Sequence, residues 1–380
     1  MLWLTILLSV SALIVAGALG AAVRTGGTGL YFAFGVIEDF GSIVVSGVHY
    51  DESRANIIVN GVAHQPRSAL KLGMVVAIEG ELDYALGSGT ASVVRADRAL
   101  LGQVEDVNVA TGEVRILAQR VAFDAATRYD GFSGIAQLAV GDWIAVHGLD
   151  DPARNLFAAT LIELVAPPGA ALAEIRGAAS NAHDGRFRID GLEVLSQEIH
   201  VSSGDFVAVK GIYDDRARSL RATEVIVTAE VDIHENAETE IEGFIADFRS
   251  RGEFTVAGVA IDASTAQIEG GTMNDLKPGV RVTVEGTVLN GVLIAEEIEL
   301  KDARTNSTTP RTSFIELEGV VSAFNSLGDF VVKGRRIDAS GASISIKGNR
   351  LPAVGQKAHI KGQRLTDGSI KATRVEFEKP

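Results

Sequence analysis

An eight-residue phrase bounded by two glycines recurs five times in this 380-residue chain and constrains the fold more than any other feature. Its clearest copy is residues 279–286 (GVRVTVEG). In every copy the glycines are seven residues apart, and apolar residues stand three and five positions after the first glycine. The copies begin at Gly73, Gly141, Gly204, Gly279 and Gly355. This period-two alternation predicts a half-buried β-strand, and the glycines predict points where the backbone turns or is closely approached.

Each phrase belongs to a longer unit. The units open on a glycine at 35, 102, 177, 243 and 319, and they close on an alanine followed by apolar residues three and five positions later. The closing alanines are Ala91, Ala159, Ala222, Ala295 and Ala372. Because an offset of three breaks strict alternation, we expect a β-bulge beside each alanine. Asn290-Gly291 and Asp367-Gly368 predict tight hairpin turns before this closing strand.

A repeat of roughly 63 to 76 residues is longer than a solenoid repeat, so each copy must bury its own small core. About five short strands fit into that length, and closing them into a barrel hides the strand edges. We therefore predict an all-β fold: a tandem array of five small antiparallel β-barrels after an N-terminal hydrophobic helix. Each barrel is expected to resemble an oligonucleotide- or oligosaccharide-binding (OB) barrel.

The expected units follow from the repeat and from the segments between copies. They are 1–23 (signal peptide or membrane anchor), 30–100, 101–165, 174–229, 240–301 and 314–378. The first two barrels have no spacer and should pack together. Residues 166–170 (APPGA) predict a short stiff linker, and polar connectors follow, so the third to fifth barrels could sit as separate beads. The polar segment 270–277 could hold one helical turn.

Residues 2–23 carry no charge and run from a hydrophobic stretch into small residues. This order is typical of a signal peptide, with cleavage after Ala18 or Ala22, although no basic residue precedes the stretch. The segment is also long enough to span a bilayer as a retained anchor. Either alternative predicts export to the periplasm, the cell envelope or the exterior, with membrane contact only through this segment.

The amino-acid composition limits the classes of binding partner that the chain could have. The formal net charge of −14 disfavours generic nucleic-acid binding, and the absence of cysteine excludes disulfides and thiolate sites. From residue 315 onward, however, 11 Lys and Arg stand against 7 Asp and Glu. This excess is either a solvated face or a docking patch for an acidic partner or a neighbouring barrel. Its residues include Lys333, Arg335, Arg336, Lys347, Arg350, Lys357, Lys361 and Arg364.

No catalytic or cofactor motif is found. The seven histidines lack ligand spacing, and Ser133 lacks the Gly-x-Ser-x-Gly elbow. The pairs Asp150-Asp151 and Asp214-Asp215 predict hairpin turns, with a loose calcium site as the alternative. We therefore predict no catalytic, cofactor or metal residues.

Aromatic residues could instead serve as stacking platforms. Phe40, Phe248 and Phe324 occupy one equivalent position, and Trp143 is the tryptophan outside the N-terminal segment. Smaller apolar residues at the same position of other copies favour packing in the core or at the barrel mouth.

Three phrases resemble a known family. They are residues 35–47 (GVIEDFGSIVVSG), 70–76 (LKLGMVV) and 140–148 (VGDWIAVHG). The chain, over residues 26–378, resembles the bacterial exported modules described as domain of unknown function 5666. The resemblance implies tandem β-barrels of the cell envelope and no known reaction. Members often begin with a lipid-modified cysteine, which this chain lacks.

The sequence thus predicts a non-enzymatic envelope or extracellular protein that acts as a structural spacer or as a binding scaffold for protein or polysaccharide. One alternative is an OB-like array that binds carbohydrate or a small ligand. Another is an enzyme with an unrecognised site.

Overall fold

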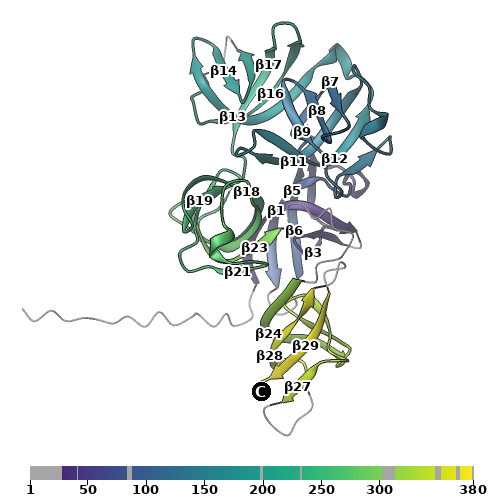
Figure 1. The fold of residues 1–380 in the computed structure, drawn as a ribbon, viewed down its shortest axis with the longest axis vertical. Coiled ribbons are helices and arrows are strands. Elements are labelled where there is room, and N and C mark those ends of the chain that lie inside the picture. The colour runs from purple at the N-terminus through teal and green to yellow at the C-terminus, as the bar shows by residue number, and fades with distance from the viewer. Residues whose placement is uncertain are drawn as a thin grey trace, which may run out of the picture.

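The computed structural model describes residues 28–40, 42–83, 88–196, 200–231, 233–301, 313–346, 352–364 and 369–378. Over these ranges the chain is built from β-strands and four single 3₁₀ turns, so the predicted all-β class is confirmed (Figure 1). Within them, no helix combines the length and the apolar character that a bilayer crossing would need. The expected N-terminal helix at 1–23 lies outside the described residues.

The fourth repeat is a closed five-stranded barrel. Its strands are β18 (Glu238–Ser250), β19 (Glu253–Val256), β20 (Val259–Asp262), β22 (Arg281–Leu289) and β23 (Val292–Lys301). Antiparallel pairs link β18 to β19, β19 to β20, β22 to β23 and β18 to β22, and a parallel pair of β20 with β23 closes the ring. The short β21 (Gln267–Glu269) extends β23 in parallel.

The third and fifth repeats close in the same way, so the structure contains three small closed five-stranded barrels of this order. The third consists of β13 (Ala173–His183), β14 (Arg186–Ile189), β15 (Leu192–Leu195), β16 (Phe206–Asp214) and β17 (Ser219–Thr228). The fifth consists of β24 (Ser313–Ser326), β25 (Asp329–Val332), β26 (Arg335–Asp338), β28 (Lys357–Arg364) and β29 (Ile370–Phe377), with β27 (Ser343–Ile346) beside β29. The prediction of small closed β-barrels is confirmed.

The first two repeats follow the same pairing order. The first has β1 (Thr28–Phe40), β2 (Ile43–Val45), β3 (Val48–Asp51), β4 (Asn56–Val59), β5 (Val75–Asp83) and β6 (Ser88–Ala96). The second has β7 (Leu100–Asn108), β8 (Glu113–Ile116), β9 (Gln119–Ala122), β10 (Arg128–Asp130), β11 (Trp143–Asp151) and β12 (Leu156–Val165). Here β5 pairs with both β1 and β6, and β11 pairs with both β7 and β12.

The four 3₁₀ turns lie between strands. They are η1 (Arg67–Ala69), η2 (Ile135–Gln137), η3 (Gly169–Ala171) and η4 (Met273–Asp275). The turn expected within 270–277 is η4, and the side chains of Thr272 and Asp275 cap it reciprocally. The predicted linker at 166–170 runs into η3, between β12 and β13.

The two glycines of the signature phrase have different roles. The first adopts a positive φ in all five copies, for example 76° at Gly279, which a residue with a Cβ rarely tolerates. The second is closely approached, because a Cβ on Gly286 would overlap the carbonyl oxygen of Ile294 on β23. The ladder register shifts at this point, so the predicted bulge opposite Ala295 is confirmed.

The predicted hairpin turn at Asn290-Gly291 is confirmed, because both residues have positive φ between β22 and β23. Asp367-Gly368 lies outside the described residues. The predicted aspartate turns are also confirmed: Asp214 Oδ1 accepts the backbone N–H groups of Arg216 and Ala217 at 3.0 Å each. Asp151 accepts that of Arg154 at 3.2 Å.

The second and third repeats are not separate beads. The start of β7 pairs antiparallel with the start of β13, which joins the two repeats in one 11-stranded sheet, and one hydrophobic cluster runs through both. The short connection after β12 brings these two strand edges together, and pairing satisfies their exposed backbone groups. The apolar cores of these two barrels are therefore continuous with each other.

The fourth repeat is likewise joined to the first, because β1 pairs in parallel with β18 in a 12-stranded sheet. In Figure 1 this pair of repeats lies between the second and third repeats above and the fifth repeat below. The bead arrangement is therefore wrong for the third and fourth repeats. Among the described strands, those of the fifth repeat form a sheet of their own, which pairs with neither of the larger sheets.

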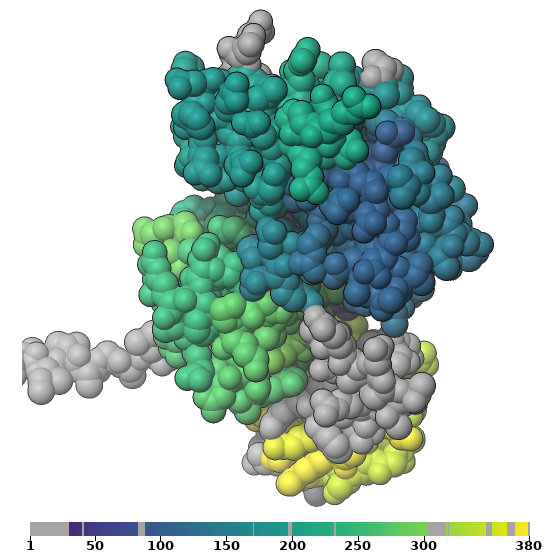
Figure 2. Space-filling view, turned by 45° about the horizontal axis from the view of Figure 1, so that its top comes forward, coloured from purple at the N-terminus to yellow at the C-terminus, as the bar shows by residue number. Residues whose placement is uncertain are grey.

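The first two repeats pack together, as predicted. Leu161 of β12 enters the core of the first repeat. Lys71 Nζ lies 2.6 Å from Asp130 Oδ2 and 2.5 Å from Glu163 Oε2 of the second repeat. A smaller cluster of Val75, Leu149 and Phe244 joins the first, second and fourth repeats. In the space-filling view the second repeat (blue) lies against the fourth repeat (green) (Figure 2).

Candidate functional site

The basic residues predicted near the C-terminus lie on two parts of the fifth barrel. Lys333 and Arg335 lie at the tip of the β25–β26 hairpin, and Arg336 Nε is 2.7 Å from Asp329 Oδ1. Burial raises the pKa of Glu297 in the fourth repeat, and the positive charges of Arg335 and Lys333 oppose that rise. The hairpin tip therefore lies near a neighbouring repeat of the same chain.

Lys357 and Lys361 are exposed on β28, which β24 separates from the β25–β26 hairpin. Lys361 lies opposite Arg374 in the ladder with β29. Lys347 and Arg350 lie outside the described residues, as does the side chain of Arg364. The described members of the predicted patch therefore occupy two separate strand pairs.

The aromatic residues considered as stacking platforms are packed against apolar neighbours. Trp143 is buried against Leu101 and Ala145. Phe248 stacks on Phe254 with ring centroids 6.3 Å apart, and Phe324 lies 5.7 Å from Phe330. The side chain of Phe40 lies outside the described residues. These positions support packing and form no row of exposed rings.

In each repeat, two residues seven positions apart lie diagonally across the hairpin formed by the second and third strands. These residues are Ser42 and His49 in the first repeat, Glu113 and Arg120 in the second, Arg186 and Glu193 in the third, Glu253 and Ala260 in the fourth, and Asp329 and Arg336 in the fifth. In four of the repeats the two side chains form a polar contact. In the third repeat the basic member comes first, and a second arginine, Arg188, follows two residues later.

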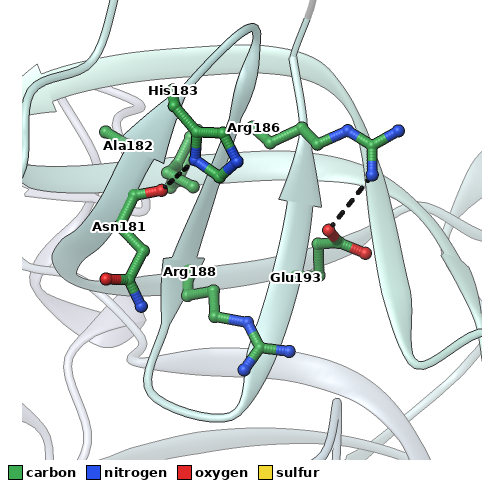
Figure 3. Close-up of a pocket in the computed structure, with 7 residues that line it drawn as sticks. Asn181, Ala182, His183, Arg186, Arg188 and Glu193 are labelled. Carbon is green, nitrogen blue, oxygen red and sulfur yellow. Dashed lines mark hydrogen bonds and ion pairs between the residues drawn. The ribbon is translucent and has the colours of Figure 1, made fainter.

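An open groove of about 460 Å³ lies on this hairpin in the third repeat (Figure 3). Asn181, Ala182 and His183 of β13 line one side, and β14 and β15 supply Arg186, Arg188 and Glu193. Arg186 and Arg188 are two residues apart in one strand, so both side chains leave the same face, while the alternate Phe187 is buried in the barrel.

A β-bulge shapes this groove. The β13–β14 register shifts between Ser180 and His183, and Asn181 adopts a positive φ of 50°. Asparagine tolerates this left-handed conformation better than most residues. The bulge lets the Ala182 N–H donate to Ser203 Oγ at 3.0 Å and places His183 beside the arginines. The bulge in β13 therefore positions the residues that line one side of the groove.

The groove carries positive charge that its own residues balance only in part. Arg186 Nη1 lies 3.4 Å from Glu193 Oε1, and His183 Nδ1 lies 2.7 Å from the Asn181 carbonyl oxygen. Arg188 lies opposite Glu193 in the β14–β15 ladder, but among the described residues its guanidinium has no hydrogen-bond or ion-pair partner, and Figure 3 shows the ion pair formed by Arg186 instead. An arginine fork of this kind suits a carboxylate or another planar anion.

A second polar group lies where the first two repeats meet. His147 is buried, its Nε2 lies 3.4 Å from Glu163 Oε1, and its Nδ1 has no partner. Burial alone would raise the pKa of Glu163, but hydrogen bonds and charge from His147 and Lys71 lower it to about 2. Among the residues that the structure describes, no group of three or more His, Cys, Asp or Glu side chains could hold a metal ion. His147, Glu163 and Lys71 therefore form a polar cluster at the interface between the first and second repeats.

Sequence reasoning missed the groove. Arg186 and Arg188 look like ordinary exposed positions of an alternating strand, and the repeat as a whole is not basic. The available signal was an alignment of the five hairpins on the glycine before each second strand. In that alignment the third copy alone reads Arg-x-Arg.

Fold and site together define an all-β protein of small closed barrels with a partly unbalanced basic groove on one of them. Residues 102–163, 242–299 and 318–376 match the family model described as domain of unknown function (DUF5666), and three matches along the chain are consistent with a repeat-containing protein of that family. A comparison with curated proteins found no matching relative.

Proposed function

We propose that this chain is an exported, non-enzymatic array of five OB-like modules that binds a carboxylate-bearing polysaccharide through the groove of the third repeat. The observation that carries the proposal is the unpartnered Arg188 guanidinium beside the Arg186–Glu193 pair. Export rests on the uncharged apolar segment at residues 2–23.

The strand order supports an OB-like assignment. In the third repeat the first strand, β13, pairs with the second and the fourth, and the third and fifth strands are parallel neighbours. OB barrels bind oligosaccharides and oligonucleotides on the face of the second and third strands and on the adjoining loops. In the third repeat those strands are β14 and β15, which line the groove.

The net charge of −14 argues for a ligand that is less densely charged than a duplex nucleic acid, which carries one charge per about 1.7 Å of its axis. Long-range repulsion opposes a densely charged polyanion such as a nucleic acid. A polysaccharide with separated carboxylates can place one of them on Arg188, while its hydroxyl groups meet Asn181, His183 and Glu193. Because the groove is open and exposed, we expect weak affinity per site that falls with added salt.

The test is isothermal titration of the full chain with polygalacturonate and with its methyl-esterified form. We expect the acid form to bind and the ester to bind at least tenfold more weakly. Arg186→Ser/Arg188→Ser should weaken polygalacturonate binding at least tenfold. The matched control, Arg216→Ser/Arg221→Ser, changes the net charge equally on exposed positions of the same barrel and should bind normally.

Equal binding of the acid and the ester would contradict carboxylate recognition. Equal losses in both double variants would show a general charge effect and would also contradict the groove as the site.

For the basic residues of the fifth repeat, the nearness of Lys333 and Arg335 to Glu297 favours docking on a neighbouring repeat. We propose that role for the hairpin tip, ahead of an acidic partner protein.

A further inference from the structure

A second cavity, of about 230 Å³, lies where the first three repeats meet beside the connector to the fourth. Phe32 and Phe34 of β1 line it together with Phe157 of β12 and Phe206 of β16. Among the lining residues, Phe32 and Phe157 are buried, while Arg95 and Thr228 are exposed. Its volume lies below the range usual for drug-sized ligands, so an occupant would be small.

Acidic groups outnumber basic groups around this cavity. Glu79, Asp97, Asp150 and Glu230 line it, against Arg95 and Arg176. Arg176 is already engaged, because its Nη1 lies 2.8 Å from Asp97 Oδ2. The other oxygen of Asp97 is buried and has no hydrogen-bond partner.

Asp150 and Glu230 have no ion-pair partner among the described residues. Burial, together with the charges of Asp190, Glu230 and Asp151, raises the pKa of Asp150 to about 8. Burial raises the pKa of Glu230 to about 7. The cavity therefore holds carboxyl groups that a bound cation would stabilise in their charged form.

We propose that this cavity binds a small organic cation with an apolar, ring-bearing body. Asp150 and Glu230 pair with the charged group, and the unpartnered oxygen of Asp97 accepts a hydrogen bond from the same group. The phenylalanine rings pack on the apolar body and offer their faces to a cation. This site is separate from the groove on β14 and β15, and it does not depend on the proposed polysaccharide function.

The probe is 2-phenylethylamine, compared with the neutral 2-phenylethanol, in isothermal titration against the full chain. We expect the amine to bind at least tenfold more tightly than the alcohol. Asp150→Asn/Glu230→Gln should reduce that preference to less than twofold. The control Asp215→Asn/Glu224→Gln changes exposed acids of the third repeat equally and should keep it.

A second variant keeps the proposal testable if the double variant Asp150→Asn/Glu230→Gln does not fold. Ala99→Leu fills the cavity without changing charge and should weaken amine binding at least tenfold. Equal binding of amine and alcohol, no binding of the amine, or unchanged amine binding in the variants would each overturn the proposal.

Discussion

Gly286 lies opposite Ala295 in the β22–β23 ladder, at the point where the register shifts by one residue. The equivalent glycine and alanine meet in the same way in all five repeats, for example Gly148 with Ala159. A Cβ on this glycine would overlap the carbonyl oxygen of the residue before the alanine. The second glycine of the signature phrase is therefore required by a close contact between the backbones of two neighbouring strands.

Gly286→Ala should lower the free energy of unfolding by about 2 to 3 kcal/mol, because the strands must separate locally to admit a Cβ. Gly341→Ala is the control, since no atom lies within 4 Å of a Cβ there. It should change stability by less than about 0.5 kcal/mol. Urea unfolding measures both, and similar effects at the two sites would contradict the close-approach explanation.

Glu240 makes the junction of the first and fourth repeats sensitive to pH. Tyr31 Oη donates a hydrogen bond to Glu240 Oε2 at 2.7 Å, and both side chains are buried. Burial, with the charge of Glu285, raises the pKa of Glu240 from 4.5 to about 8. A raised carboxyl pKa means that the folded state holds the proton more tightly than the unfolded state does.

Stability from Glu240 is therefore fully present below pH 4.5 and is lost as pH rises to about 8. The loss should be on the order of a few kcal/mol. Glu240→Gln should flatten this dependence in urea unfolding at pH 5, 6.5 and 8, while Glu81→Gln, an exposed control, should not. An unchanged slope in the Glu240→Gln variant would show that this carboxyl group is not buried at the junction.

Lys71 links the first two repeats through Asp130 and Glu163. Because Lys71 is 40% exposed, solvent weakens the pair, and Lys71→Met should lower the free energy of unfolding at pH 7 by about 1 kcal/mol. The lowered pKa of Glu163 means that its contribution is present above pH 4.5 and is lost as pH falls toward 2.

The difference in the free energy of unfolding between the Lys71→Met variant and the native chain should therefore become smaller as the pH falls below 4.5. Lys277→Met, at an exposed lysine of the fourth repeat, is the control. A difference that is independent of pH would indicate that Lys71 acts through packing of its aliphatic stem.

The fifth repeat should be held against the fourth partly by charge. Lys333→Glu/Arg335→Glu places two negative charges near Glu297 and should increase the radius of gyration in small-angle X-ray scattering at low salt. Lys371→Glu, exposed in the same repeat, should leave the radius unchanged. An unchanged radius in the double variant would mean that other contacts place the fifth repeat.

The repeats, their closed barrels and the bulge at each closing alanine could be predicted from the sequence, because local spacing controls them. The β1–β18 junction could not be predicted, because it joins strands about 200 residues apart and no local spacing in the sequence specifies which strand edges meet. The same holds for the groove. Its wall depends on the left-handed Asn181, and no spacing rule distinguishes Arg188 from other exposed strand residues.

The pKa shifts of Asp150, Glu230 and Glu240 could not be predicted either. Each carboxyl group lies near a junction between repeats, and the burial that raises its pKa comes wholly or partly from a neighbouring repeat. In the isolated sequence each looks like an ordinary charge at a strand end or in a connector.

Hydrogen–deuterium exchange of the full chain with saturating polygalacturonate tests the central claim most directly, because it locates the ligand on the molecule. The account predicts slowed exchange at residues 181–195, around Arg186 and Arg188, with the fifth repeat unchanged. Protection elsewhere with none in this hairpin, or no protection at all, would contradict it.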